Sequence, residues 1–587
     1  MNHLSFFDSR NLFIMVRRQH DLRDSSSWEE ITFSSGAKVL IKCIQNEGGR
    51  FIAGIPGEQV LGVLDALYDV QDELSFILMK DERNAAFFAD AYYRLTGNPG
   101  ICLSTLGPGA TNLITGLANA YLDRSAVVAF TGQVSTRDLA KEYHQKLSVP
   151  QIFAPVTKWT FSVQRPDLIP ESVRKAFKIA KTEKPGPVHL ELPSDVMSQE
   201  CDAKPLPPLL YEPRYPPGGN LEVIKKAFDY IMEAEFPIVL IGSGANRAEA
   251  GSVLKEFVEK LSLPVVSTYM GKGVIPEDHP LHLGVLGAFS QDVARRAILR
   301  ADVVIAVGYD FTELPASYWN GDRRRLVVHI DATVAEIDRC YPVRYEIVGN
   351  IGRTLTFMLK HKVTEPSIKR RRRLKEVEEL KKAFEEQFYP EDESEALKPS
   401  DVVKALNEVL SDDTIVSVDV GEHKIWMSRC LILRKQRRYL VSNGLAAMGF
   451  SLPAAIAAKT VFNDKPVLCT IGDGGFTMSF GELETVRRLK LAFPILIFDN
   501  DMLGQIYTKQ RITYGERTIG VSFKNPDFMK VAEAFDLEGV TVTERDELKE
   551  VLKEAFASDK TTLIDVKVDK EETLRVIEKL GATRPIY

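Results

Sequence analysis

At about 100–200 residues per domain, a chain of 587 residues is long enough for three or four domains, each with its own core. A hydrophobic content of 44% with 27% charged residues excludes collagen-like, mucin-like and wholly disordered chains. The net charge of −6, from 75 basic and 81 acidic residues, provides no overall positive field to attract nucleic acid or an anionic membrane.

The six cysteines are scattered and never stand in CxxC spacing, which argues against a disulfide framework and a cysteine-built metal site. No apolar run approaches the roughly 20 residues that a membrane span needs, and the N-terminus lacks a secretory signal pattern. We therefore expect a cytoplasmic protein without a membrane partner. Residues 1–34 are polar and irregular, and we expect an N-terminal extension to which the sequence assigns no function.

Three segments alternate short β-branched runs with amphipathic stretches, the pattern of doubly wound parallel sheets covered by helices. The predicted fold class is therefore α/β in three domains, at 35–204, 218–365 and 398–587, with a charged linker helix at 366–397. The predicted strands are Arg50–Ala53, Gly100–Ser104, Ala126–Phe130, Val188–Leu192, Pro237–Ile241, Pro264–Ser267, Val303–Val307, Leu326–Ile330, Thr414–Val418, Pro466–Ile471, Pro494–Phe498 and Thr562–Val568. The basic run Lys369–Arg373 is followed by acidic residues, so we interpret it as part of a solvated helix without a nucleic-acid partner.

Two Gly-rich segments follow predicted strands, and they differ in what they predict. Gly242-Ser243-Gly244 lacks the third glycine of a dinucleotide loop and is weak evidence for one. In the third domain, Asp473 ends one predicted strand and Asn500 ends the next, one helical crossover later, so their oxygens are expected to meet at one sheet edge. With a backbone carbonyl at Met502, they form a candidate Mg²⁺ site completed by diphosphate oxygens and water, and Gly474 and Gly475 let backbone amides approach phosphate.

From Lys38 to about Val568 the sequence resembles the thiamine-diphosphate-dependent enzymes. The resemblance lies in Gly472–Gly475 followed by Asn500, and in three first-domain motifs in family order: Gly54–Gly57, Asp81–Ala86 and Leu106–Asn112. It implies a pyrimidine-binding first domain, a central domain and a diphosphate-binding third domain. The cofactor-binding residues that it implies are Pro56, Glu82, Asn112, Gly421, Glu422, His423, Met448, Gly472, Asp473, Gly474, Gly475, Asn500, Met502, Leu503, Gly504 and Gln505.

The resemblance also implies individual roles. Glu82 would hydrogen-bond the cofactor's aminopyrimidine and favour the tautomer that activates the thiazolium carbon, and Met448 would hold the cofactor in a V shape. Without the motifs around them, Glu82 would be interpreted as a surface acid, Met448 as core filler and His423 as a structural histidine.

Within this family the closest resemblance is to the acetolactate synthases of the catabolic, flavin-independent type. The passages that carry it are Tyr143–Lys146 with Phe153–Lys158, Val307–Asp310 with Trp319-Asn320, Gly421–Arg429, and Gly472–Phe476 with Glu482–Thr485. The implied reaction is decarboxylation of pyruvate and condensation of the hydroxyethyl unit with a second 2-keto acid. His144 and Gln145 are implied to face the reacting carbon and position the acids; the alternative for His144 is a loop histidine at a subunit contact.

Four departures from the family pattern affect these expectations. Gly284–Ser290 replaces the flavin-binding run, so we expect no bound FAD. Lys509 stands where biosynthetic synthases have a tryptophan that helps to choose the second keto acid, which leaves the acceptor open. Asp81 and Arg83 replace a histidine and a glutamine beside Glu82, which leaves the donor open.

Alternatives inside the family are a 2-keto-acid decarboxylase, another carboligase and a 2-hydroxyacyl-CoA lyase; outside it, the alternative is a catalytically silent regulatory subunit. Because Glu82 and Asp473 belong to different predicted domains, and family members build each site across two subunits, we expect a homodimer or a tetramer. The other expected partners are small 2-keto acids.

Overall fold

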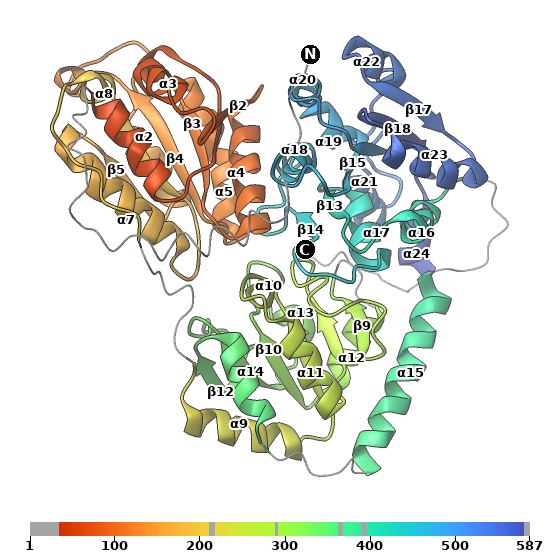
Figure 1. Cartoon of the computed structure of the whole chain (residues 1–587). Coiled ribbons are helices and arrows are strands. Elements are labelled where there is room, and N and C mark those ends of the chain that lie inside the picture. Colours follow the sequence, from red (N-terminus) through yellow and green to blue (C-terminus); the bar gives the residue numbers. More distant parts are fainter. Residues whose placement is uncertain (1–34, 210–217, 288–291, 362–367, 389–395, 580–587) are drawn as a thin grey trace.

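The structure of the protein is a computed structural model that describes residues 35–209, 218–287, 292–361, 368–388 and 396–579. The predicted N-terminal extension and part of the Gly284–Ser290 segment lie outside the described residues. Within the described part of the chain there are three parallel sheets of six strands, each covered by helices, and the predicted fold class is confirmed (Figure 1). No described helix has both the length and the apolar character needed to cross a bilayer.

The first sheet has its strands in the order β2 (Ser75–Leu78), β1 (Phe51–Gly54), β3 (Gly100–Ser104), β4 (Val127–Gln133), β6 (Val188–Pro193) and β5 (Trp159–Ser162). Its helices are α2 (Gly36–Asn46), α3 (Leu61–Tyr68), α4 (Glu82–Thr96), α5 (Pro108–Leu122), α6 (Val149–Phe153), α7 (Ile169–Lys181) and α8 (Ser194–Ser198). Alternate strand residues face opposite layers, so Ile101 packs with α2 and α7 whereas Cys102 packs with α4 and α5. The sheet is therefore buried on both sides.

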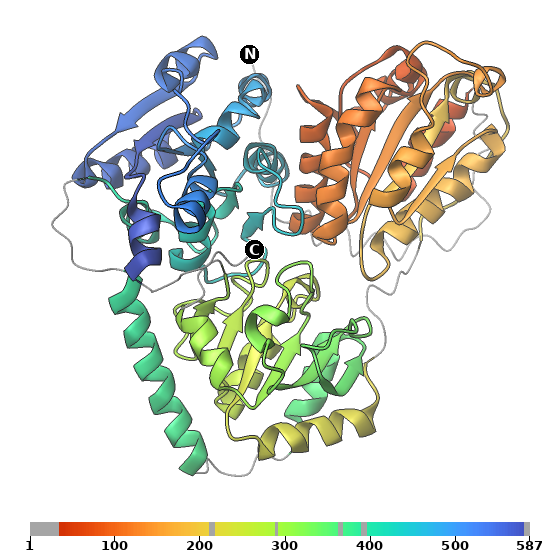
Figure 2. The same cartoon turned by 180° about the vertical axis from the view of Figure 1, so that it is seen from behind.

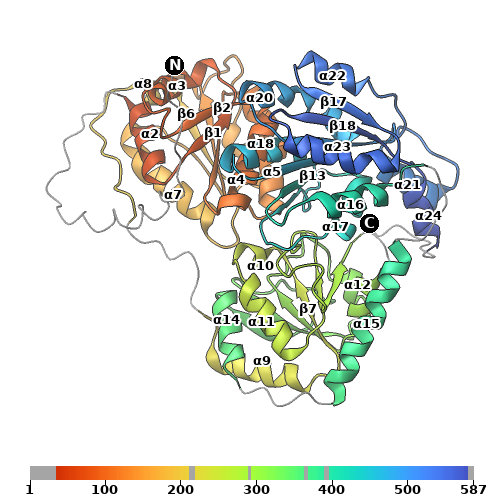
Figure 3. The ribbon, with the colours of Figure 1, turned by 45° about the vertical axis from the view of Figure 1, so that its right-hand side comes forward.

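The middle sheet has the order β12 (Val343–Val348), β11 (Leu326–Asp331), β10 (Val303–Val307), β7 (Pro237–Ile241), β8 (Val265–Ser267) and β9 (His282–Val285). Its helices are α9 (Leu221–Glu233), α10 (Ser243–Arg247), α11 (Gly251–Leu261), α12 (Val293–Arg300), α13 (Ser317–Asn320) and α14 (Ile351–Leu359). The predicted linker helix is present as α15 (Ile368–Phe388), which runs along the middle domain toward the third (Figure 3). Val377 and Leu380 of α15 are buried against the middle domain.

The third sheet has the order β14 (Tyr439–Val441), β13 (Ile415–Val418), β15 (Val467–Gly472), β16 (Pro494–Asp499), β18 (Thr562–Lys567) and β17 (Glu538–Val542). Its helices are α16 (Pro399–Val409), α17 (Glu422–Cys430), α18 (Ser451–Val461), α19 (Asp473–Thr477), α20 (Leu483–Arg488), α21 (Gly504–Tyr514), α22 (Phe528–Ala534), α23 (Arg545–Ala557) and α24 (Glu572–Lys579). Seen from behind, the first and third domains lie side by side above the middle domain (Figure 2).

Helix α4 joins the first domain to the third. It begins at Glu82 because the Asp81 side chain caps it, accepting from the Arg83 amide at 2.8 Å. Its inner face shares a hydrophobic core with α18, in which the rings of Phe87 and Phe450 meet edge to face at 5.5 Å. A second contact fixes the start of α4, since the Lys80 amide and the Asn84 side chain both donate to Glu482 Oε1, at 2.9 and 3.0 Å.

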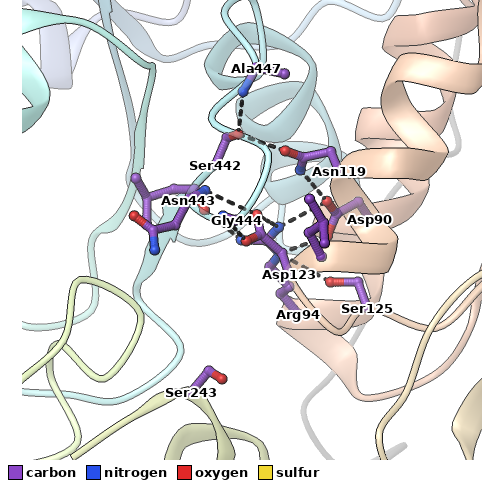
Figure 4. Close-up of polar contacts among 12 residues, drawn as sticks. Asp90, Arg94, Asn119, Asp123, Ser125, Ser243, Ser442, Asn443, Gly444 and Ala447 are labelled. Atoms are coloured by element: carbon purple, nitrogen blue, oxygen red, sulfur yellow. Dashed lines mark hydrogen bonds and ion pairs between the residues drawn. The ribbon is translucent and has the colours of Figure 1, made fainter. Parts of the chain in front are cut away.

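A buried ion network extends this junction (Figure 4). The Arg94 guanidinium bonds Asp90 at 2.6 Å, Asp123 at 2.9 Å and the Val441 carbonyl at 2.6 Å, and both carboxylates have fully buried side chains. Asp123 in turn accepts the backbone N–H groups of Asn443 and Gly444. The network therefore holds the loop after β14 against the first domain.

A second chain of hydrogen bonds holds the same loop (Figure 4). Asp90 accepts from the Asn119 amide at 2.8 Å, Asn119 Oδ1 accepts from the Ser442 hydroxyl at 2.6 Å, and the Ala447 amide donates to that hydroxyl at 2.9 Å. Because Asn119 links Asp90 of the first domain to Ser442 of the third, the first domain helps to fix the conformation of this loop.

Replacing Arg94 by Met is expected to lower the free energy of unfolding by about 3–5 kcal/mol, because two buried carboxylates lose their counterion. Urea unfolding followed by circular dichroism measures the change. The control is Arg165→Met, which removes an exposed pair with Asp167 and is expected to leave the free energy of unfolding almost unchanged. Equal effects of the two substitutions would contradict the importance of the network.

Candidate active site

A cavity of about 510 Å³ lies between the middle and third domains. Its floor is formed where three neighbouring parallel strands of the third sheet end: β13 before Val420, β15 before Asp473 and β16 before Asn500. The carboxyl ends of parallel strands are where open α/β sheets bind ligands. The middle domain contributes the other wall through Tyr269, Leu286, Gly287, Thr312, Glu313, Leu314 and Pro315.

Asp473 and Asn500 lie together on the cavity floor. They follow β15 and β16, which pair in parallel as the sequence predicted, and the Asn500 backbone N–H donates to Asp473 Oδ2 at 3.2 Å. The other carboxylate oxygen accepts from the Gly474 amide at 2.7 Å. Burial raises the pKa of Asp473 to about 6. Met502 also lines the cavity, so all three predicted metal ligands lie at one place.

Asn525 supports Asp473 from behind and was not predicted from the sequence. Its side-chain N–H group donates to Asp473 Oδ2 at 2.9 Å and to Asp499 Oδ1 at 2.8 Å. Asp499 is also paired with Lys567, which bonds Asp565 at 3.0 Å. These contacts fix the orientation of the Asp473 carboxylate toward the cavity.

Glu422 and His423 begin α17 at the end of β13, and both are buried in the cavity wall. Burial raises the pKa of Glu422 to about 7, partly offset by the hydrogen bond from Asn500. Burial lowers the pKa of His423 to about 3, so its imidazole is neutral at physiological pH. His423 Nε2 is buried without a hydrogen-bond partner among the described residues, which leaves this nitrogen available to a ligand.

The remaining third-domain candidates also lie in this cavity. Gly421, Met448, Gly472, Gly474, Gly475, Leu503, Gly504 and Gln505 all line it. Met448 belongs to the loop held by Asp123 and approaches Gly474, whose added Cβ would lie 3.5 Å from the Met448 methyl carbon. Lys509, on α21, lines the same wall as Gln505.

The first-domain candidates lie at the carboxyl edge of their own sheet. Glu82 is only 7% exposed, and one of its oxygens accepts from the Asn112 side chain at 3.0 Å. Gln145 lies beside the start of α5, because a Cβ on Gly107 would be 2.7 Å from the Gln145 carbonyl oxygen. Pro56 and His144 are exposed. None of the described first-domain residues lines the cavity, so the two groups of candidates form separate half-sites in a single chain.

Glu313 and Lys424 line the cavity and were not predicted from the sequence. Lys424 Nζ donates to the Ser442 carbonyl at 2.8 Å and to Asn443 Oδ1 at 3.0 Å, and burial lowers its pKa to about 8. Glu313 accepts from the Ser243 amide at 2.8 Å and from the Thr268 hydroxyl, and burial raises its pKa to about 7. Lys424 lies in the Gly421–Arg429 passage that carries the family resemblance, whereas no local motif marks Glu313.

The Gly242-Ser243-Gly244 segment has a structural role in packing. Added Cβ atoms on Gly242 and Gly244 would lie 2.4 Å from the Gly308 carbonyl oxygen and 2.7 Å from Gly308 Cα. Both glycines are therefore needed for close approach to the loop after β10. This packing role agrees with the sequence analysis, in which the segment was only weak evidence for a dinucleotide-binding loop.

Three family models match the chain. They are the thiamine pyrophosphate enzyme N-terminal TPP binding domain at residues 34–152, the central domain at residues 224–358 and the C-terminal TPP binding domain at residues 419–566. The two halves of the candidate site thus fall in the two matched TPP binding domains, and the chain carries the domains that bind thiamine diphosphate.

Curated relatives match over almost the whole chain. A probable acetolactate synthase large subunit of Methanocaldococcus jannaschii is 38% identical over 93% of this chain and 94% of its own length. Acetolactate synthase of Bacillus subtilis is 34% identical, covering 92% and 94%. Acetolactate synthase isozyme 2 large subunit of Escherichia coli is 30% identical, covering 94% and 98%. The chain therefore belongs to the thiamine pyrophosphate enzymes and, among them, to the acetolactate synthase family.

The buried Glu313 predicts a pH-dependent stability. Because its pKa is raised above the ordinary 4.5 to about 7, the folded protein binds this proton more tightly than the unfolded chain. The resulting stabilisation, about 3 kcal/mol, is present below pH 4.5 and is lost as the pH rises through 7. Glu313→Gln keeps the acceptor for Ser243 and Thr268 but should lack this dependence.

Urea unfolding at pH 5 and pH 8 should therefore show a larger fall in stability for the unmodified protein than for Glu313→Gln. Glu171→Gln, at an exposed position of α7, serves as the control and should behave like the unmodified protein. Parallel pH profiles for all three proteins would contradict a titrating Glu313.

Proposed function

We propose that this chain is a thiamine-diphosphate- and Mg²⁺-dependent acetolactate synthase that decarboxylates pyruvate and joins the remaining two-carbon unit to a second 2-keto acid. The observation that carries the proposal is the pairing of Asp473 and Asn500 at the ends of neighbouring strands β15 and β16, in one cavity. The membership of the chain in the acetolactate synthase family supports the same reaction.

The cavity floor fits a metal-bound diphosphate. The Asp473 carboxylate, the Asn500 amide oxygen and the Met502 backbone carbonyl are hard oxygen donors of the kind that Mg²⁺ prefers, and diphosphate oxygens and water would complete its coordination. No group of three or more His, Cys, Asp and Glu side chains able to hold a metal occurs among the residues that the structure describes. The unpartnered His423 Nε2 suits a phosphate contact.

Bound thiamine diphosphate supplies the carbon nucleophile and the electron sink. Glu82 would hold a proton at a ring nitrogen of the aminopyrimidine. Burial and the hydrogen bond from Asn112 shield the Glu82 carboxyl group from water, which suits this role. Met448 would contact the cofactor from the loop that Asp123 holds. Gln145, beside α5, and His144 position the keto acids, and the cavity cations Lys424 and Lys509 favour carboxylate substrates.

A second copy of the chain would bring the two half-sites together in one active site. Glu82 does not line the cavity of its own chain, so we infer a homodimer, or a dimer of dimers, in which each cavity receives Glu82 of the partner subunit. Apolar side chains exposed near both half-sites are suited to burial in such a contact: Tyr143 and Leu147 on the first domain, and Leu445, Met478 and Ile506 on the third.

Purified protein incubated with pyruvate, thiamine diphosphate and Mg²⁺ should form acetolactate, and Glu82→Gln should reduce this rate by at least about 10²-fold because the proton at the pyrimidine is no longer controlled. Cofactor binding, measured by calorimetry, should change little. Glu171→Gln should retain full turnover.

Acetaldehyde as the only product of the unmodified protein would replace the synthase with a decarboxylase. Unchanged turnover of Glu82→Gln would contradict the role of Glu82. Bound cofactor without either product would indicate a different substrate or a silent subunit.

A further inference from the structure

Glu422 is bonded to one of the two side chains of the proposed metal site. Its Oε2 accepts from the Asn500 side-chain N–H group at 3.0 Å, and the residue is only 7% exposed. Asn500 reaches the other side of the site through its backbone N–H, which donates to Asp473 Oδ2. Glu422 therefore lies behind Asn500, in the wall of the same cavity.

This bond determines which way the Asn500 amide points. An asparagine amide has an oxygen on one side and an NH₂ group on the other, and the two orientations have nearly the same shape. In the structure the NH₂ group donates to Glu422 Oε2, so the amide oxygen faces away from Glu422. With the opposite orientation, two N–H donors would point at a cation, which cannot be bound that way.

The chain makes room for this contact at Gly504, the first residue of α21. A Cβ on Gly504 would lie 1.9 Å from Glu422 Oε2 and 3.1 Å from the Asn500 side-chain nitrogen. Any larger residue would displace the carboxylate from Asn500. The absence of a side chain at Gly504 is therefore explained by the Glu422–Asn500 bond.

We propose that Glu422 is a positioning residue for the divalent cation: by holding the Asn500 NH₂ group, it presents the amide oxygen to the metal. This inference rests on the proposed function, because it takes Asp473 and Asn500 as metal ligands. Contacts behind the ligands of a metal site commonly change its affinity by 10–100-fold when they are removed.

The test measures Mn²⁺ binding by electron paramagnetic resonance in the presence of thiamine diphosphate, so that turnover is not needed. Glu422→Ala should weaken Mn²⁺ binding by about 10–100-fold. Glu422→Gln can still accept from Asn500 and should stay within about threefold of the unmodified protein. In an Asn500→Ala background, Glu422→Ala should cause little further loss, because the group that it orients is gone.

Glu571→Gln is the matched control. Glu571 is an acid that acts electrostatically on Glu422 but bonds Tyr507, at 2.6 Å. The Glu571→Gln variant should bind Mn²⁺ like the unmodified protein if Glu422 acts by orienting the Asn500 amide and not by its negative charge.

Three results would overturn the inference: unchanged binding by Glu422→Ala, equal losses for the Gln and Ala variants, or the same loss in the Asn500→Ala background. A fourth result concerns the proposed function itself. If the unmodified protein binds no Mn²⁺ with thiamine diphosphate present, the metal site is wrong, and the inference about Glu422 fails with it.

Discussion

The arrangement of the active site depends on the buried contact between Arg94, Asp90 and Asp123. Asp90 and Arg94 lie on the helix that begins with Glu82, and Asp123 holds the loop that carries Met448. One network thus connects the helix that carries the candidate residue Glu82 on the first domain with a loop that lines the cavity on the third. Because the two groups of candidate residues are held apart in one chain, the function proposed above uses a second copy to bring them together.

The ionisable side chains of the cavity suit a metal-bound diphosphate. Burial keeps His423 neutral and raises the pKa values of Asp473, Glu422 and Glu313, because a buried carboxylate loses the hydration of its negative charge. A divalent cation offsets that charge and the charge of the diphosphate together, so metal and cofactor are expected to bind interdependently.

Sequence patterns predicted the inner strands of each sheet and missed the edges. The twelve predicted strands correspond to the inner four of each sheet, which are buried on both faces and form apolar runs. The edge strands β2, β5, β12 and β17 are partly exposed, β9 contains a histidine and a glycine among its four residues, and β14 has only three residues. Asp473 and Asn500 were predictable because each follows an inner strand, but Asn525 and Glu313 reach the site from loops without a motif.

The most direct test of the divided site uses two inactive variants, Glu82→Gln and Asp473→Asn, co-expressed with different affinity tags and purified as the mixed dimer. If each site takes Glu82 from one copy and Asp473 from the other, one of the two sites is intact, and the mixed dimer should form acetolactate at about half the normal rate. A mixed dimer as inactive as both parents would show that Glu82 and Asp473 act within one chain, contrary to this account.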